Sequence, residues 1–412
     1  MVAHGPFTVR HSQLPINDLQ LTRIIEELEK PDILTNVHAP GISQPLCTAI
    51  QVALLDLLRS WDIIPASVCG HSSGEIAAAY SAGALKRESA WKIAYFRGVI
   101  AEKLVAKTTC SPTTMMSVGL NEQEVLPYLA GTDVSVACIN SPSNVTLSGE
   151  QTAIQQLKDT FEKKEIFAKT LAVKIAYHSK VMAVGAAEYQ DLIGYIETPA
   201  HSDPKMDHTI AFYSSVSGKK IDSQALRNPE YWVQNLVSPV RFNQAVVSLV
   251  SGSERGKQSN HFLVEIGPQA ALRRPIKDSL DTVLEKQRWR YVSVLNRSSN
   301  GARSILEAAG QLWSCGVGVD LGAVNQASLR SNRASQVLPD LPSYPFSRAQ
   351  EYWDESRLSR NYAFRPHRRH ALLGLREKDW NSYEPSWKHV IRISENPWIA
   401  DHAVSSLKSC IS

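Results

Sequence analysis

The sequence lacks the cysteine spacing that metal sites and disulfide frameworks require. Its six cysteines lie far apart and form no Cys-x-x-Cys pair: Cys47, Cys69, Cys110, Cys138, Cys315 and Cys410. In a chain of 412 residues this pattern argues against a cysteine-rich metal site and against a fold held together by disulfides. We therefore expect no bound metal, and a reducing, cytoplasmic setting.

Long apolar runs and strong charge are also absent. No stretch approaches about 18 consecutive apolar residues, and the first residues, MVAHGPFTVR, contain no apolar segment of the signal-peptide kind. The net charge of +4 is spread along the chain, and the densest basic stretch, RPHRR at 365–369, lies in a loop-like segment. These absences argue against a membrane span, secretion and nucleic-acid binding.

The composition that remains is that of a globular protein. Hydrophobic residues make up 43% of the chain and charged residues 20%, which is enough apolar material for two or three packed domains. An apolar helix is predicted over 45–61, a short strand over 66–69 and a second apolar helix from residue 75. Strand, sharp turn and buried helix in this order indicate an α/β fold with a parallel sheet, to which the apolar run 261–267 adds a strand.

A different pattern appears between residues 115 and 174. Strand-like and helix-like segments alternate there in the order β-α-β-β-α-β, which is the ferredoxin-like arrangement. We expect a small ferredoxin-like subdomain inserted into the larger α/β domain. Further along, the prolines of LPSYPFSRAQEYW, Pro339, Pro342 and Pro345, exclude a regular helix and predict an extended connector, with the main domain boundary near residue 335.

The segment Gly70–Gly74 (GHSSG) matches the G-x-S-x-G turn that carries a nucleophilic serine between a strand and a helix. We expect both glycines to be required, because a Cβ at either position would collide with the neighbouring strand and helix. Ser72 is then the nucleophile, and the backbone N–H of Ser73 helps to stabilise an oxyanion. Glu75 is interpreted as a favourable partner of the helix dipole. The alternative is a simple Gly/Ser turn.

Several segments together resemble the acyltransferase domains of polyketide and fatty acid synthases, especially those of fungal highly reducing polyketide synthases. They occur in that family's order over roughly residues 20–310: SQPLCTAIQVALLDLL, GHSSGEIAAAYSAGAL, AYFRG, CINSPSNVTLSG, AYHSKVM, PEYWVQNLVSPVRF and LVEIGPQAAL. The resemblance implies a hydrolase-like α/β core. It also implies a serine–histidine dyad whose imidazole is oriented by backbone carbonyls rather than by an acid.

The resemblance assigns roles to individual positions. Ser72 corresponds to the acylated serine, His178 to the general base and acid, and Arg97 to the arginine that pairs with a malonyl carboxylate. Gln44, Asn140 and His71 correspond to positions near the active site. Histidine chemistry suits proton transfer near neutral pH, and a planar guanidinium can hold a carboxylate in two places. The residues alone leave open a snorkelling surface arginine, a packing histidine at 178 and a space-filling histidine at 71.

The bulky ring of Tyr177, in the stretch IAYH at 175–178, resembles the form associated with malonyl rather than methylmalonyl selection. One methyl group excluded by shape changes the free energy of binding by only ~1–3 kcal/mol. The implied substrate is malonyl-CoA, with no bound cofactor. The implied partners are the phosphopantetheine arm of an acyl carrier protein and other polyketide synthase domains.

Both ends of the chain shape the expected domain plan. Residues 336–369 resemble the linker that follows such acyltransferases, and 370–412 resemble the start of a dehydratase hotdog domain, where His402 falls on the catalytic histidine. Residues 1–18 are unassigned and contain no strand with a Gly-Gln-Gly turn. The acyltransferase domain, 19–335, is therefore expected to be truncated, with a strand missing at the edge of its sheet or within it. Two alternatives to acyl transfer remain, a catalytically silent fragment and a serine hydrolase.

Overall fold

The structure is a computed structural model, which describes residues 26–31, 34–107, 111–197, 210–252, 260–285, 288–328, 340–346, 349, 353–401, 403–404 and 407–408. The chain divides into two compact units, Met1–Ser335 and Gln336–Ser412. The predicted unassigned stretch 1–18 and His402 lie outside the described residues.

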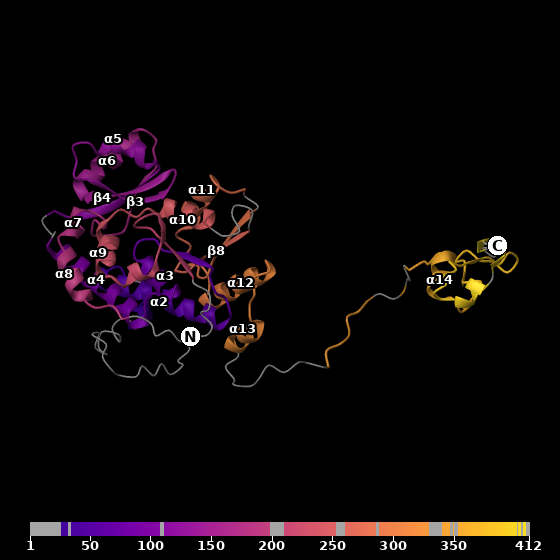
Figure 1. The fold of residues 1–412 in the computed structure, drawn as a ribbon. Coiled ribbons are helices and arrows are strands. Elements are labelled where there is room, and N and C mark those ends of the chain that lie inside the picture. Colours follow the sequence, from indigo (N-terminus) through magenta and orange to yellow (C-terminus); the bar gives the residue numbers. More distant parts are fainter. Residues whose placement is uncertain are drawn as a thin grey trace. The chain divides into compact units, whose positions relative to one another are not determined.

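The first unit (Figure 1) contains two short sheets, each of which includes one parallel strand pair. In one sheet β1 (Ser67–Cys69) runs parallel to β6 (Ala211–Ser214), and β7 (Lys219–Ile221) is antiparallel to β6. In the other, β8 (His261–Glu265) runs parallel to β9 (Trp289–Ser293). Among the described residues no strand joins the two sheets, so the α/β fold is present while its parallel sheet is discontinuous.

Three helices from the first part of the chain pack against one another, and one of them also packs against β1. These are α2 (Pro40–Ser60), α3 (Gly74–Ser81) and α4 (Arg87–Lys107), and α2 packs along α4 and α3. By length and composition α2 is the one described helix that is long and apolar enough to cross a membrane. Its buried side chains, which include Leu46, Val52, Leu55 and Leu58, face the protein interior, as in a core helix of a globular domain.

A four-stranded antiparallel sheet forms a separate layer with its own core. The strands β2 (Thr113–Val118), β3 (Ser135–Ser141), β4 (Asn144–Glu150) and β5 (Ala168–Thr170) lie in the order β3-β4-β2-β5. The helices α5 (Glu122–Leu129) and α6 (Gln151–Lys163) alternate with them, so the element order is the β-α-β-β-α-β order read from the sequence. The core of this layer includes Met116, Val125, Leu147, Ile154 and Phe161.

Further helices of the first unit follow β5 along the chain, and several contribute side chains to the buried clusters. Trp232 of α9 and Tyr189 of α8 are buried in one core cluster, and Phe242 of α10 in a second. The elements are α7 (Lys180–Ala183), α8 (Ala186–Ile193), the 3-10 helix η1 (Ser223–Arg227), α9 (Pro229–Val237), α10 (Phe242–Ser251), α11 (Arg273–Leu280), α12 (Gly301–Ser314) and α13 (Leu321–Ser328).

The second unit contains little regular structure. Residues 340–346 form neither helix nor strand, in agreement with the prolines there. Large apolar side chains of this unit are exposed, among them Tyr344, Phe346, Trp353 and Tyr383. Its elements are α14 (Arg357–Ala363), the antiparallel pair β10 (Leu375–Arg376) and β11 (Trp387–Lys388), η4 (Pro397–Asp401), and the pair β12 (Ala403–Val404) and β13 (Leu407–Lys408).

Candidate active site

Ser72 lies in the sharp turn between β1 and α3, as the GHSSG motif predicts. Its φ is 54°, in the left-handed region that costs a non-glycine residue energy and is often found at functional sites. Gly70 is required by this turn, because a Cβ there would lie 2.2 Å from the backbone nitrogen of Glu75. For Gly74 the expected collision is wrong: the nearest atom to its Cβ would be 3.9 Å away, which is an ordinary contact.

The imidazole of His178 contacts the serine directly. Ser72 Oγ lies 2.7 Å from His178 Nε2, and His178 Nδ1 lies 2.9 Å from the backbone oxygen of Ser238. A carbonyl oxygen can only accept, so Nδ1 carries the proton and donates it to Ser238. Nε2 is then free to accept the hydroxyl proton of Ser72. The imidazole is thus oriented by a backbone carbonyl.

The surroundings of His178 favour its neutral form. The side chain is buried, and desolvation together with the charge of Arg97 and the nearby His71 lowers its pKa to about 3. Its backbone has a φ of 57°, so both members of the pair are held in the left-handed region. A neutral imidazole beside the hydroxyl is the protonation state that a general base needs.

Arg97 is fully buried on α4 and points at the same hydroxyl. Its Nη2 lies 3.1 Å from Ser72 Oγ, and its Nη1 lies 2.7 Å from Oδ1 of Asn235. The alternative interpretation of Arg97 as a surface arginine with its charged end in solvent is therefore wrong. The three side chains at 72, 97 and 178, far apart in the sequence, converge on one point.

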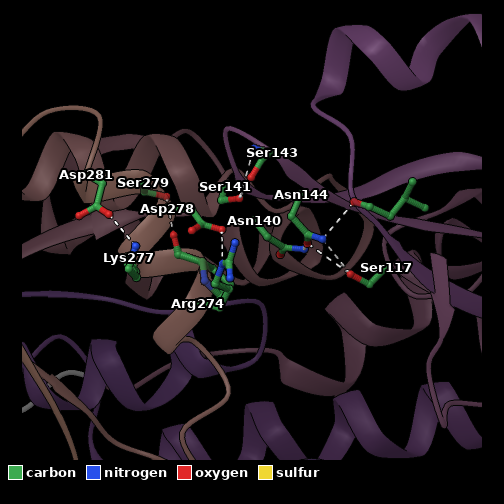
Figure 2. Close-up of polar contacts among 12 residues, drawn as sticks. Ser117, Asn140, Ser141, Ser143, Asn144, Arg274, Lys277, Asp278, Ser279 and Asp281 are labelled. Carbon is green, nitrogen blue, oxygen red and sulfur yellow. Dashed lines mark hydrogen bonds and ion pairs between the residues drawn. The ribbon is translucent and has the colours of Figure 1, made fainter. Parts of the chain in front are cut away.

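His71 and Asn140 form the neighbouring wall. His71 Nε2 lies 2.9 Å from Asn140 Oδ1, and burial lowers the pKa of His71. The amide nitrogen of Asn140 donates to Asn144, and Asn144 donates to Ser117 (Figure 2). The same nitrogen of Asn140 also donates to Thr146. This chain of amides fixes the Asn140 oxygen toward His71, which therefore carries its proton on Nε2.

The other predicted positions lie around the same point. Gln44 of α2 donates over a long 3.4 Å contact to the hydroxyl of Tyr177, and burial raises the pKa of that phenol. Ser73 is the residue that precedes α3, so its backbone N–H lies at the N-terminal, partially positive end of that helix. No group of three or more His, Cys, Asp or Glu side chains that could hold a metal occurs within the part of the chain that the structure describes.

Comparison with known proteins identifies the family. Residues 13–319 match the family described as "Acyl transferase domain", which is well over half of the chain. The chain belongs to the acyl transferase domain family. It is therefore an enzyme by family, and the motif order of the sequence is explained by membership in this family.

Relatives with curated descriptions are fungal polyketide synthases. The chain is 40% identical to the highly reducing polyketide synthase NEC1 of Pyricularia oryzae and 43% identical to the highly reducing polyketide synthase Preu1 of Preussia isomera. These matches cover 92% and 93% of this chain but only 15% and 16% of the relatives, so the chain spans about a sixth of their length.

Solved structures agree with this assignment. The acyltransferase domain from module 8 of the salinomycin polyketide synthase superposes with a TM-score of 0.63 at 26% identity, covering 75% of this chain and 71% of that one. The loading acyltransferase of the avermectin synthase, at 24% identity and a TM-score of 0.59, shares the fold.

The acyltransferase site also contains two residues whose part in it sequence reasoning missed. Asn235 of α9 accepts from Arg97 and donates to Glu75 (2.8 Å) and to the backbone oxygen of Ser72 (3.1 Å). Glu75 is fully buried and also accepts from the Ser215 N–H and the Tyr231 hydroxyl. Burial raises its pKa, and these hydrogen bonds oppose the rise.

The interpretation of Glu75 as only a helix-dipole partner is thus incomplete. The one signal in the sequence was an acidic residue at the start of the otherwise apolar stretch EIAAAY, 75–80, where a carboxylate has to find partners on another element. Its partner Asn235 carried no such signal, because one asparagine among many does not indicate what it contacts.

Proposed function

We propose that this acyltransferase domain transfers a malonyl unit from CoA to the phosphopantetheine thiol of an acyl carrier protein, within a highly reducing polyketide synthase. One observation carries the proposal: the Ser72 hydroxyl lies 2.7 Å from the neutral imidazole of His178 and 3.1 Å from the buried guanidinium of Arg97. The base explains acyl transfer, and the guanidinium explains a substrate that carries a carboxylate.

The reaction follows from this geometry in two balanced halves. His178 Nε2 takes the proton of Ser72 as Oγ attacks the thioester carbonyl, and the N–H of Ser73 is positioned to stabilise the oxyanion. As the intermediate collapses, the carbon–sulfur bond breaks and the imidazolium protonates the departing CoA thiolate. In the second half His178 Nε2 takes the proton of the carrier thiol as its sulfur attacks the malonyl ester. The carbon–oxygen bond to Ser72 then breaks, and the imidazolium returns the proton to Oγ.

Arg97 is proposed to hold the free carboxylate of the malonyl unit. A guanidinium offers five N–H groups, and the two contacts to Ser72 and Asn235 leave donors for a bidentate carboxylate. Tyr177 is proposed to restrict space for an α-methyl group. Gln44, His71 and Asn140 are proposed to line the pocket, since their side chains adjoin the dyad or Tyr177.

The remaining domain assignments belong to the same proposal. The layer from β2 to β5 is proposed to be a ferredoxin-like subdomain, on the basis of its element order and strand order. Residues 336–369 are proposed to be the linker, and 370–412 the start of a dehydratase fold, from their resemblance to fungal synthases. Other polyketide synthase domains are the proposed partners, because the curated relatives extend well beyond this region.

Detection of the acyl-enzyme tests the function. The full chain is incubated with malonyl-CoA and analysed by intact-mass spectrometry, with Ser72→Ala as the control. The expected result is a malonyl adduct on the wild type that peptide mapping places at residue 72 and that the control lacks. A folded wild type of unchanged mass would refute the proposed activity.

A further inference from the structure

We infer that Asn235 is a positioning residue for acyl-group selection: its amide, oriented by the carboxylate of Glu75, holds the guanidinium of Arg97 at the place where the substrate carboxylate binds. The inference rests on the proposed function, and it adds two residues that the motif comparison leaves without a role. It also gives the buried acidic side chain of α3 a function.

The contacts of Arg97 show why a separate support is needed. Two of its hydrogen bonds reach the Ser72 hydroxyl and the Asn235 oxygen. Once Ser72 carries an acyl group its hydroxyl proton is gone and Oγ is an ester oxygen, so that contact weakens during the reaction. The 2.7 Å bond to Asn235 does not depend on the state of the nucleophile. It can therefore keep the guanidinium in place throughout the cycle.

Charge decides which way the Asn235 amide points. A guanidinium only donates hydrogen bonds, so the amide oxygen has to face Arg97. The carboxylate of Glu75 accepts, so the amide nitrogen has to face Glu75, at 2.8 Å. A flipped amide would place NH₂ against the cation and oxygen against the carboxylate, which costs two buried hydrogen bonds. Glu75 thus fixes the amide that fixes Arg97.

Glu75 is itself held in place. The backbone N–H of Ser215 donates to one of its oxygens, and the hydroxyl of Tyr231 donates to the other at 2.7 Å. Both Glu75 and Arg97 are fully buried, and Asn235 is only 2% exposed. A cation and a carboxylate are therefore linked through one amide without touching each other.

The alternative is that Asn235 only packs α9 against the nucleophile turn, since it also donates to the Ser72 backbone oxygen. The two roles differ in one measurable quantity, the ratio of kcat/KM for malonyl-CoA to that for acetyl-CoA. A change that only disturbs the turn slows both substrates alike. A change that misplaces Arg97 slows the substrate with the carboxylate more.

The variant Asn235→Asp tests this in the full chain with almost no change in size. Its carboxylate can pair directly with Arg97 and occupy the donors meant for the substrate. It also lies beside the Glu75 carboxylate, so loss of folding is a risk. The double variant Glu75→Gln/Asn235→Asp removes that risk, because the Gln amide can donate to the new carboxylate and still accept from Ser215. Asn228→Asp at the exposed N-cap of α9 is the matched control, since Asp caps a helix as well as Asn.

Acylation by both CoA esters is measured for all four proteins together with thermal unfolding. We expect the double variant to unfold close to the wild-type temperature while its malonyl-to-acetyl ratio falls about 10- to 100-fold, mainly through KM for malonyl-CoA. Asn228→Asp should keep the wild-type ratio. An unchanged ratio in a folded, acylated double variant would overturn the inference and leave the proposed function standing. A wild type that no CoA ester acylates would overturn both.

Discussion

The buried position of Arg97 restricts the kind of substrate that suits this site more than any other side chain does. A buried cation without a directly bound carboxylate is expensive, and the protein offsets this cost with one amide and a carboxylate beyond it. An enzyme that only hydrolysed neutral esters would have no use for such a charge. The arrangement instead suits a substrate that brings the missing carboxylate.

Replacing Arg97 therefore tests substrate choice. Arg97→Ala should lower kcat/KM for malonyl-CoA about 10- to 100-fold, because charge-assisted hydrogen bonds are worth ~1.5–3 kcal/mol. Acetyl-CoA should be used at least as well as before. Initial rates of Ser72 acylation measure both. Arg87→Ala is the control: Arg87 lies on α4, as Arg97 does, and the change removes its ion pair with Asp56 of α2. Equal losses for both esters would contradict the carboxylate-binding role.

The pH dependence of Ser72 reactivity tests the state of His178. Its pKa is lowered to about 3, so the imidazole stays neutral and able to accept a proton as the pH falls through the ordinary histidine value of about 6.5. Labelling of Ser72 by a fluorophosphonate should therefore change little between about pH 7.5 and 5.5. Arg97→Ala removes one cause of the lowered pKa of His178. The loss of labelling on acidification should therefore begin at a higher pH in this variant than in the wild type. A half-loss near pH 6.5 in the wild type would count against this environment.

At the scale of elements, the turn between β1 and α3 provides a matched pair of glycines. Gly70→Ala places a Cβ 2.2 Å from backbone nitrogen, whereas Gly74→Ala meets nothing closer than 3.9 Å. The first change should destabilise the protein by ~1–3 kcal/mol or more and abolish acylation. Gly74→Ala should leave the free energy of unfolding and the acylation of Ser72 close to their wild-type values. Urea unfolding and intact mass measure the two effects, and equal behaviour of the pair would contradict the close packing of this turn.

The elements also show which features of the fold could be predicted from the sequence. The strand–turn–helix around Ser72 and the β-α-β-β-α-β order were predictable, because apolar periodicity and glycine spacing are local properties of the chain. The free space at Gly74 was not predictable, because it depends on which side chains from elsewhere in the chain lie against that position.

At the scale of the whole molecule, all the site residues belong to the first unit, which contains every buried cluster described above. A chain ending at Ser335 should therefore fold and acylate Ser72 at a rate within about threefold of the full chain, since the second unit contributes no residue to the described site. The rate of malonyl adduct formation is measured for the shortened chain and for the full chain. Loss of acylation in a folded shortened chain would show that the second unit is required.

The sequence alone determined the family, the nucleophile turn and the residue types of the candidate site, because motifs at Ser72, His178 and Arg97 each carry their chemistry in a short stretch. Only the tertiary structure showed which residues orient and support these three side chains. The Ser238 carbonyl orients the imidazole, and Asn235 and Glu75 support the guanidinium. The physical reason is that a buried polar group has to be satisfied by whichever partner the fold brings near, and these partners lie 60 to 160 positions away in the chain.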